Sequence, residues 1–174
     1  MDFSRLNTRR VLLGAIASLL LIIAILFLPW YTVDLAIEPR MPTINGEPNP
    51  QYDPDTLICG QESSCTGFQT FPILRWLLLL AAIAPLILAY ILVRGHKLSY
   101  PPGEMTMIAG FSATVLIAYN GIIDKPGSGP GEIGVSLDYG YWVALVAAIG
   151  IAIVGFTRSI ESGPRKTRKA PGTV

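Results

Sequence analysis

Four uncharged apolar stretches, each long enough to cross a lipid bilayer, constrain this sequence more than any other feature. They lie at Val11–Trp30, Trp76–Val93, Met105–Ile123 and Tyr139–Thr157. A hydrocarbon core about 30 Å thick needs about 20 apolar residues at a rise of about 1.5 Å each. Because no water satisfies the backbone amides there, each stretch is expected to be an α-helix. The sequence therefore predicts an all-α membrane protein, an antiparallel four-helix transmembrane bundle.

The charged residues, which make up 14% of the chain, are distributed unevenly between its polar segments. The two loops after the first and third apolar stretches contain only Arg40 and Lys125 as basic residues, together with most of the acidic ones. Ten of the thirteen basic residues lie in the N-terminal segment, the middle loop and the C-terminal region: Arg5, Arg9, Arg10, Arg94, Lys97, Arg158, Arg165, Lys166, Arg168 and Lys169. Since basic loops stay on the cytoplasmic side, we expect a multi-pass plasma-membrane protein with both termini in the cytoplasm.

These features divide the chain into nine segments. The predicted spans are 11–30, 71–93, 104–123 and 139–158; the predicted cytoplasmic segments are 1–10, 94–103 and a disordered basic tail, 159–174; the predicted extracytoplasmic loops are 31–70 and 124–138. The first apolar run follows Arg9 and Arg10, as a signal peptide would, but it is longer than the apolar region of one. No small-residue cleavage site follows at Pro29–Asp34, so we expect this run to be retained.

The first extracytoplasmic loop predicts a small β-sheet on the outer face of the bundle. Apolar and polar residues alternate along Tyr31–Ile37, a period of two that is typical of a half-buried strand. Five prolines and an Asn-Gly pair within Glu38–Pro54 predict turns. Further short strands are expected at Leu57–Cys59, Cys65–Phe71 and, in the second loop, Val135–Leu137. The expected architecture is a helical bundle capped by a small extracytoplasmic sheet.

The two cysteines, Cys59 and Cys65, both fall in the first extracytoplasmic loop. An oxidising compartment favours a disulfide between them. Their spacing suits a hairpin bridge, which stabilises the fold by about 2–2.5 kcal/mol in the chain-entropy model. A redox pair and free or metal-bound thiols are the alternatives, although the spacing is not the Cys-x-x-Cys of redox motifs.

Arg75 is the most informative single polar residue, because it lies about one turn inside the second predicted span. Both the helix macrodipole and lipid disfavour a cation at this position. One interpretation is that the side chain extends to the lipid headgroups. A second is a salt bridge with Asp34, Asp124 or Asp138, which would tie the outer loops to the helix. A third is a ligand or ion site.

Other residues of the spans predict local features of the bundle. Pro29 is expected to end the first helix and to leave Trp30 and Tyr31 at the level of the outer headgroups. Pro85 in mid-span predicts a kink in the second helix. Asn120 predicts a polar contact between helices, with a role in a transport pathway as the alternative.

Small residues recur about four positions apart in three of the predicted spans. This spacing places them on one helix face and lets two backbones approach closely. Packing within the bundle is the first interpretation, and a homo-oligomer interface is the second. The residues are Gly14 and Ser18, Gly110 and Thr114, and Ala144, Ala148 and Ala152.

The cytoplasmic segments offer basic residues and little else. The tail residues Arg165, Lys166, Arg168 and Lys169 are expected to attract anionic inner-leaflet lipids, at roughly 1 kcal/mol per charge, or to act only as topology determinants. His96 is the only histidine, so no metal site or haem is expected. No catalytic set, phosphate loop or mid-span acid is recognisable, so we expect no cofactor and no nucleic-acid partner.

Several of these features together resemble one family of membrane proteins. They are a Trp after the first span (Trp30), an outer loop with one cysteine pair (Cys59 and Cys65), an Arg near the top of the second span (Arg75), and four spans with cytoplasmic ends. This pattern resembles the claudin-like superfamily, which includes peripheral myelin proteins and calcium-channel gamma subunits. The resemblance implies a left-handed four-helix bundle under a small extracellular sheet, with lateral partner contacts through that sheet.

Three functions are consistent with these observations. The first is a non-enzymatic membrane subunit that binds a partner, or assembles a complex, through its extracytoplasmic domain. The second is a small oligomeric transporter or channel, suggested by Pro85, Asn120 and the small-residue faces. The third is a membrane enzyme of thiol–disulfide or lipid chemistry, which would need a reactive Cys59 or Cys65, or polar groups near Arg75.

Overall fold

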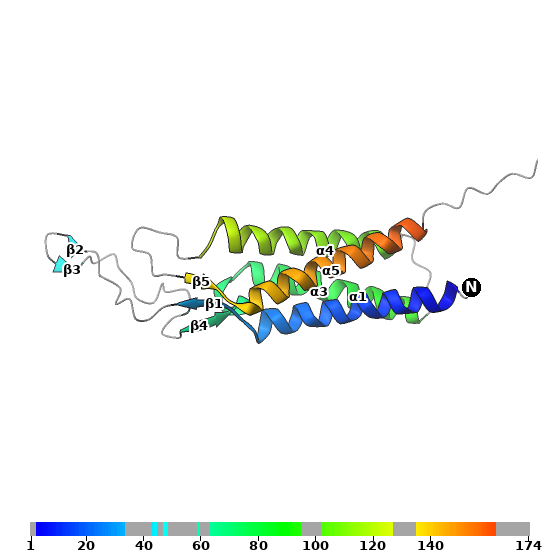
Figure 1. The fold of residues 1–174 in the computed structure, drawn as a ribbon, viewed down its shortest axis with the longest axis horizontal. Coiled ribbons are helices and arrows are strands. Elements are labelled where there is room, and N and C mark those ends of the chain that lie inside the picture. Colours follow the sequence, from blue (N-terminus) through cyan, green and yellow to red (C-terminus); the bar gives the residue numbers. More distant parts are fainter. Residues whose placement is uncertain are drawn as a thin grey trace, which may run out of the picture.

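A computed structural model of the chain describes residues 3–33, 43–44, 47–48, 59, 63–94, 102–126 and 135–162. Four long helices dominate the described part and lie side by side (Figure 1): α1 (Phe3–Leu26), α3 (Leu74–Val93), α4 (Pro102–Ala118) and α5 (Tyr139–Ser162). Four segments are long and apolar enough to cross a membrane: Arg9–Leu26, Leu74–Val93, Tyr139–Ile160, and Gly103–Ile123, which covers most of α4 and the helical turn that follows it. The predicted number and approximate positions of the long apolar helices are therefore confirmed.

The helices meet along seams in which buried residues are alternately three and four positions apart. This heptad spacing is typical of helices that pack side by side as in coiled coils. The side chains at the seams are mostly small, whereas large aliphatic side chains such as Leu80 and Val146 are 70% and 67% exposed. The seams include Gly14, Ser18, Leu21 and Ile25 in α1; Leu78, Ala82 and Pro85 in α3; Gly103, Thr106, Gly110, Ala113 and Ile117 in α4; and Tyr141, Ala144, Ala148, Ile151 and Gly155 in α5.

Glycines bring the backbones of α4 and α5 into direct contact. A Cβ at Gly110 would collide with the backbone of Ala152, and one at Gly155 would collide with the backbone of Met107. At the ends of the same two helices, a Cβ at Gly103 would lie 2.5 Å from the Ser159 nitrogen. Close backbone approach through small residues is the main means of helix association where no hydrophobic effect acts between helices.

A three-stranded antiparallel sheet lies at one end of the bundle, which we call the sheet end (Figure 1). Its order is β4 (Ser64–Thr66), β1 (Pro29–Val33) and β5 (Val135–Leu137), so the first loop pairs with the second through β1. Thr32 stands opposite Ser64 on one side and Ser136 on the other. A separate two-residue hairpin pairs β2 (Thr43–Ile44) with β3 (Glu47–Pro48). The small sheet and its strand at Val135–Leu137 are confirmed.

Two predicted boundaries at the sheet end are wrong. The predicted first span extends to Trp30, but α1 ends at Leu26 and β1 begins at Pro29. A proline lacks an amide donor and disfavours helical backbone in the residue before it, so the chain leaves the helix early. The strand expected at Cys65–Phe71 ends at Thr66.

Thr66 ends that strand because its side chain starts a short helix, α2 (Gly67–Thr70). The Thr66 hydroxyl accepts a hydrogen bond from the Gln69 amide, and the Gln69 side chain accepts one from the Thr66 amide. This reciprocal pair is a capping box, and it is readable in the sequence as Thr-x-x-Gln. Helix α3 begins only at Leu74, after a turn that contains Pro72, so it starts later than the predicted span at residue 71.

Other differences concern the ends of α4 and α5. After Ala118 the helix widens into a π-helical turn, η2 (Tyr119–Ile123), so the predicted span to Ile123 is helical in two forms. Helix α5 continues to Ser162, so the first residues of the predicted disordered tail are helical. Its end lies just before the Gly163-Pro164 pair, a signal that stops helices. The basic tail beyond it lies outside the described residues.

Gly155→Ala should destabilise the bundle, because the new methyl group meets backbone rather than a mobile side chain. We expect a loss of about 1–3 kcal/mol in the free energy of unfolding, measured by thermal or denaturant unfolding in detergent micelles. Gly150→Ala in the same helix is the matched control, because its Cβ would only touch the Ala17 Cβ at 3.6 Å. That variant should be neutral or up to about 1 kcal/mol more stable. Equal effects at the two positions would contradict the close approach of α4 and α5.

Candidate functional site

The sheet end is organised around Trp30, whose side chain is completely buried. Its indole Nε1 donates a hydrogen bond to the Ala24 carbonyl at 2.8 Å. That carbonyl belongs to the last turn of α1, where carbonyls have no helical partner. The Trp30 ring also packs edge-on against Phe71 and Tyr141, at centroid distances of 6.4 and 5.9 Å. Trp30 therefore joins the helices to the sheet, and its level relative to the lipid headgroups stays a prediction.

Gly67 explains how a side chain as large as tryptophan fits beneath the sheet. A Cβ at Gly67 would lie 2.6 Å from two carbons of the Trp30 indole. Only glycine leaves room for the ring at this position of α2. The chain reaches it because Cys65 and Thr66, just before it, pair with β1.

Two buried tyrosines bind the π-helical turn to the rest of the sheet end. The Tyr31 hydroxyl donates to the Asn120 carbonyl at 3.3 Å, and the Tyr141 hydroxyl donates to the Ile117 carbonyl at 3.2 Å. Both tyrosine side chains have no exposed surface. A Cβ at Gly121 would collide with the Tyr141 ring, so the turn approaches that ring at a glycine. The polar groups at this depth are satisfied within the protein.

Asn120 takes part in this arrangement, but mainly through its backbone. Its side-chain amide donates to the Leu116 carbonyl of its own helix at 2.8 Å. The contact with another element is made by its carbonyl oxygen, which accepts from Tyr31. The physical reason is the π-helical turn, whose wider spacing changes which carbonyls are bonded within the helix. The contact that Asn120 makes with another element is therefore a backbone contact with a strand, and the contact between helices expected of its side chain stays a prediction.

Burial raises the pKa of the Tyr31 phenol above its usual value, and the nearby Tyr141 phenol acts in the same direction. The neutral phenol is the form that donates to Asn120, so both effects favour it. Tyr31 therefore behaves as a structural donor and has no tendency to ionise near neutral pH.

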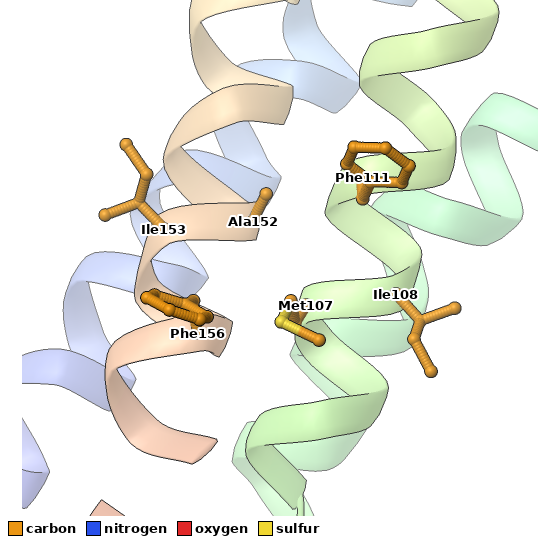
Figure 2. Close-up of a pocket in the computed structure, with 6 residues that line it drawn as sticks. All are labelled: Met107, Ile108, Phe111, Ala152, Ile153 and Phe156. Carbon is orange, nitrogen blue, oxygen red and sulfur yellow. The ribbon is translucent and has the colours of Figure 1, made fainter. Parts of the chain in front are cut away.

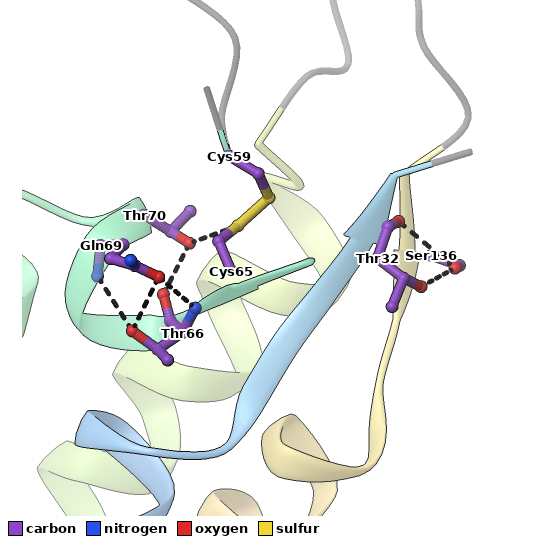
Figure 3. Close-up of a disulfide and its surroundings, with 7 residues drawn as sticks. All are labelled: Thr32, Cys59, Cys65, Thr66, Gln69, Thr70 and Ser136. Carbon is purple, nitrogen blue, oxygen red and sulfur yellow. Dashed lines mark hydrogen bonds between the residues drawn. A yellow bond between two sulfur atoms is a disulfide. The ribbon is translucent and has the colours of Figure 1, made fainter. Parts of the chain in front are cut away.

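The predicted disulfide joins Cys59 to Cys65, with an S–S distance of 2.05 Å and a Cα–Cα distance of 5.1 Å (Figure 3). Cys65 is almost completely buried in β4. Its sulfur lies 3.4 Å from the Thr70 hydroxyl, which also donates to the Thr66 carbonyl at 2.9 Å. The bridge therefore fixes Cys59, within the first loop, to the strand and the capped helix that support Trp30.

Arg75 lies in the first turn of α3, at the sheet end. Its Nη1 donates to the Phe68 carbonyl at 3.4 Å, and its guanidinium lies 4.7 Å from the Phe68 ring centre and 5.5 Å from that of Trp76. Among the described residues, no carboxylate lies within ion-pairing distance of it. Asp138 instead accepts the Tyr139 amide at the start of α5. Asp34 lies outside the described residues, so a pairing with it stays a prediction.

The outward side of the sheet carries small hydroxyl groups. The Thr32 and Ser136 hydroxyl oxygens lie 2.6 Å apart across β1 and β5 (Figure 3). Ser136 is exposed. This part of the sheet presents polar groups to solvent, while Tyr31 and Trp30 of the same strand are buried.

A shallow apolar groove of about 370 Å³ lies between α4 and α5, away from the sheet end (Figure 2). Figure 2 shows Phe111 and Phe156 projecting from the two helices on either side of Met107 and Ala152. Its lining is entirely apolar, and its walls are exposed on the outer surface of the bundle. The groove offers van der Waals contact and no group that could bind or activate a polar substrate.

The interior of the bundle contains few polar side chains. Ser18 is completely buried, and its hydroxyl has no hydrogen-bond partner. Pro85 is buried inside the continuous helix α3, and the kink expected there stays a prediction. Thr106 and Arg158 are the other buried polar residues of the described part. The seams are otherwise filled by small and aliphatic side chains.

Within the described ranges, no group of three or more His, Cys, Asp or Glu residues is placed to hold a metal ion. His96 and the basic tail residues Arg165, Lys166, Arg168 and Lys169 lie outside those ranges.

Sequence reasoning missed the role of Tyr141, Gly67 and Gly121 at the sheet end. The sequence signal for them was that aromatic residues and glycines occur together near the same ends of the apolar runs.

No protein-family model, curated protein or solved structure matches this chain.

Trp30→Phe should lower the free energy of unfolding by about 1–2 kcal/mol, since it removes the indole donor and leaves the Ala24 carbonyl unpaired. Thermal unfolding in detergent would measure the loss. Trp142→Phe is the matched control, because Trp142 is half exposed and packs only its edge on Tyr141. A control loss as large as that of Trp30→Phe would argue against the special role of the buried indole.

Stability should fall at alkaline pH because of Tyr31. Below its usual pKa of 10.0 the phenol is protonated in both the folded and the unfolded states. Above that pH the unfolded chain loses the proton while the folded protein keeps it, so the free energy of unfolding decreases as pH rises. In Tyr31→Phe this part of the decrease should disappear, which melting temperatures measured from about pH 8 to pH 11 would reveal. Tyr139→Phe, at an exposed position, should keep the wild-type slope.

Proposed function

We propose that this chain is a multi-pass membrane protein of the plasma membrane with both termini in the cytoplasm. Supporting this, the four long helices have apolar outer surfaces and small side chains at their seams, the reverse of a soluble bundle. In the sequence, the basic residues concentrate in the segments that adjoin the helix ends opposite the sheet, as the positive-inside rule requires for a cytoplasmic location. The sheet end then faces the extracytoplasmic side, where the Cys59–Cys65 disulfide would be stable.

In this membrane the protein acts as a partner-binding or complex-assembly subunit, and its extracytoplasmic sheet is the recognition surface. The observation that carries this proposal is the rigid attachment of the sheet to the bundle. Trp30 is bonded to the end of α1, Tyr31 is bonded to the end of α4, and Cys65 is covalently joined to Cys59. A surface held in this way loses little conformational entropy when a partner binds.

The alternatives have less support from the described residues. A transport pathway along the bundle axis would need polar groups, and the seams are filled mainly by Gly, Ala, Leu and Ile. A thiol enzyme would need an accessible sulfur, and Cys65 is bridged and buried. The outline shared with the claudin-like superfamily also favours contacts through the sheet. Its outer sheet, single cysteine pair and Trp after the first span are the features in common.

The orientation in the membrane can be measured with single cysteines in a Cys59→Ser, Cys65→Ser background. We expect Ser136→Cys, on the exposed side of the sheet, to react with a membrane-impermeant maleimide added to intact cells. Arg94→Cys, exposed at the opposite end of α3, should react only after the membrane is permeabilised. Labelling of Arg94→Cys in intact cells would overturn the orientation, and labelling of both sites would overturn membrane insertion.

Partner binding can be measured with a photo-crosslinking amino acid placed on the sheet. At Ser136 we expect a discrete protein adduct in native membranes, and the adduct should disappear when Thr32→Arg disturbs the surface beside it. Ser112, exposed on the outer side of α4, is the matched control and should react with lipid alone. If Ser136 yields only the uncrosslinked monomer, or the same adducts as Ser112, the sheet is not the recognition surface.

A further inference from the structure

We propose that Arg75 binds the phosphate group of a phospholipid in the leaflet that adjoins the sheet end. The site consists of the Arg75 guanidinium and the two aromatic rings that hold it, Phe68 and Trp76. This inference rests on the proposed membrane insertion and is independent of any protein partner.

The guanidinium is held in place without being neutralised. Its centre lies 4.7 Å from the Phe68 ring centre and 5.5 Å from the Trp76 ring centre, and those rings pack edge-on at 5.7 Å. One terminal nitrogen donates to the Phe68 carbonyl at 3.4 Å. Cation–π and carbonyl contacts of this kind restrict the orientation of the guanidinium but leave its full positive charge. The side chain is therefore pre-organised to receive an anion.

Among the residues that the structure describes, no acidic group balances this charge. No carboxylate of the described residues lies within ion-pairing distance of Arg75, and its Nε atom is buried without a hydrogen-bond partner. The first turn of α3 adds the partial positive charge of a helix N-terminus. Both charges are costly at the edge of a hydrocarbon layer. An anion bound from the surroundings would reduce the energetic cost of both charges.

The position of Arg75 selects a lipid phosphate as that anion. Trp76 is 59% exposed and Tyr139, at the start of α5, is 55% exposed, so exposed aromatic rings surround the sheet end. Tryptophan and tyrosine at such positions mark the level of the lipid headgroups. Phosphate oxygens accept two parallel N–H bonds from the planar guanidinium fork, a geometry that an ammonium group does not offer.

Binding can be measured on the full chain in a phosphate-free detergent by native mass spectrometry. The titrants are short-chain phosphatidylglycerol, the matching diacylglycerol without phosphate, and inorganic phosphate. We expect one phospholipid to bind with an affinity that Arg75→Gln weakens at least about tenfold, the effect of losing one charge-assisted contact. Arg75→Lys keeps the charge but loses the fork and the stacking, so it should also bind more weakly. It replaces Arg75→Gln if that variant does not fold.

Two control variants distinguish binding at Arg75 from a general effect of losing a positive charge or an exposed aromatic ring. Lys125→Gln removes one positive charge after the π-helical turn, and Trp142→Leu removes one exposed aromatic ring from α5. Both should bind the phospholipid as the wild type does. Wild-type affinity in both Arg75 variants, or an equal loss in Lys125→Gln, would overturn the proposal. Equal binding of diacylglycerol would exclude the phosphate, and inorganic phosphate that binds as tightly as the lipid would show a soluble anion to be the ligand.

Asp34, which the sequence offers as an alternative partner for Arg75, is tested by the same titration. Asp34→Asn should leave phospholipid binding unchanged. Binding at least about tenfold tighter in Asp34→Asn would show that Asp34 neutralises Arg75 in the wild-type protein, and it would overturn the assignment. Failure of membrane insertion itself would appear separately, in the maleimide labelling of Ser136→Cys and Arg94→Cys.

Discussion

The hydrogen bond from the Trp30 indole to the Ala24 carbonyl joins the helical bundle to the sheet. Ala24 belongs to the helix α1, and Trp30 belongs to the strand β1, which begins at Pro29. The last carbonyls of a helix need partners, and a buried indole supplies one without admitting water. Because the ring then lies between helix and sheet, neighbouring segments must leave room for it, as Gly67 does.

The distribution of side-chain size follows from the same need for close contact. In the proposed membrane, helix association depends on van der Waals packing, since apolar surface gains nothing by leaving an apolar solvent. Gly110 and Gly155 allow α4 and α5 to meet backbone to backbone, and the bulky side chains point outward. The arrangement fills the interior of the bundle, so the chemistry available for recognition concentrates at the ends of the helices.

At the sheet end, most polar groups are used to build the structure itself. The Tyr31 and Tyr141 hydroxyls, the Asn120 amide and the Asp138 carboxylate all have partners within the protein. Two kinds of group are left for contacts with other molecules. The hydroxyls on the exposed side of β1 and β5 suit a protein partner, and the aromatic-held guanidinium of Arg75 suits an anion. A lipid and a partner could thus bind at the same end without competing.

The sequence alone determined the number of long helices, their approximate limits, the disulfide and the strand at Val135–Leu137. The length of an apolar run, the spacing of two cysteines and the alternation of apolar and polar residues are local properties. Each can be related to a structure without knowing which distant residues lie nearby. Local signals in the sequence also mark two boundaries that the prediction missed: the capping box at Thr66, which starts α2, and the Gly163-Pro164 pair, which follows the end of α5.

Only the tertiary structure decided where Trp30 lies, which carbonyls the tyrosines bind, and what surrounds Arg75. An aromatic residue after an apolar helix is equally consistent with contact with lipid headgroups and with burial inside the protein. The sequence shows the type of residue but not which residues surround it. The neighbours of Trp30 come from α1, α2, the turn before α3, and α5, and the partners of Tyr31 and Tyr141 come from the end of α4. These contacts join residues far apart in the chain, so they depend on how the helices and the sheet pack in three dimensions.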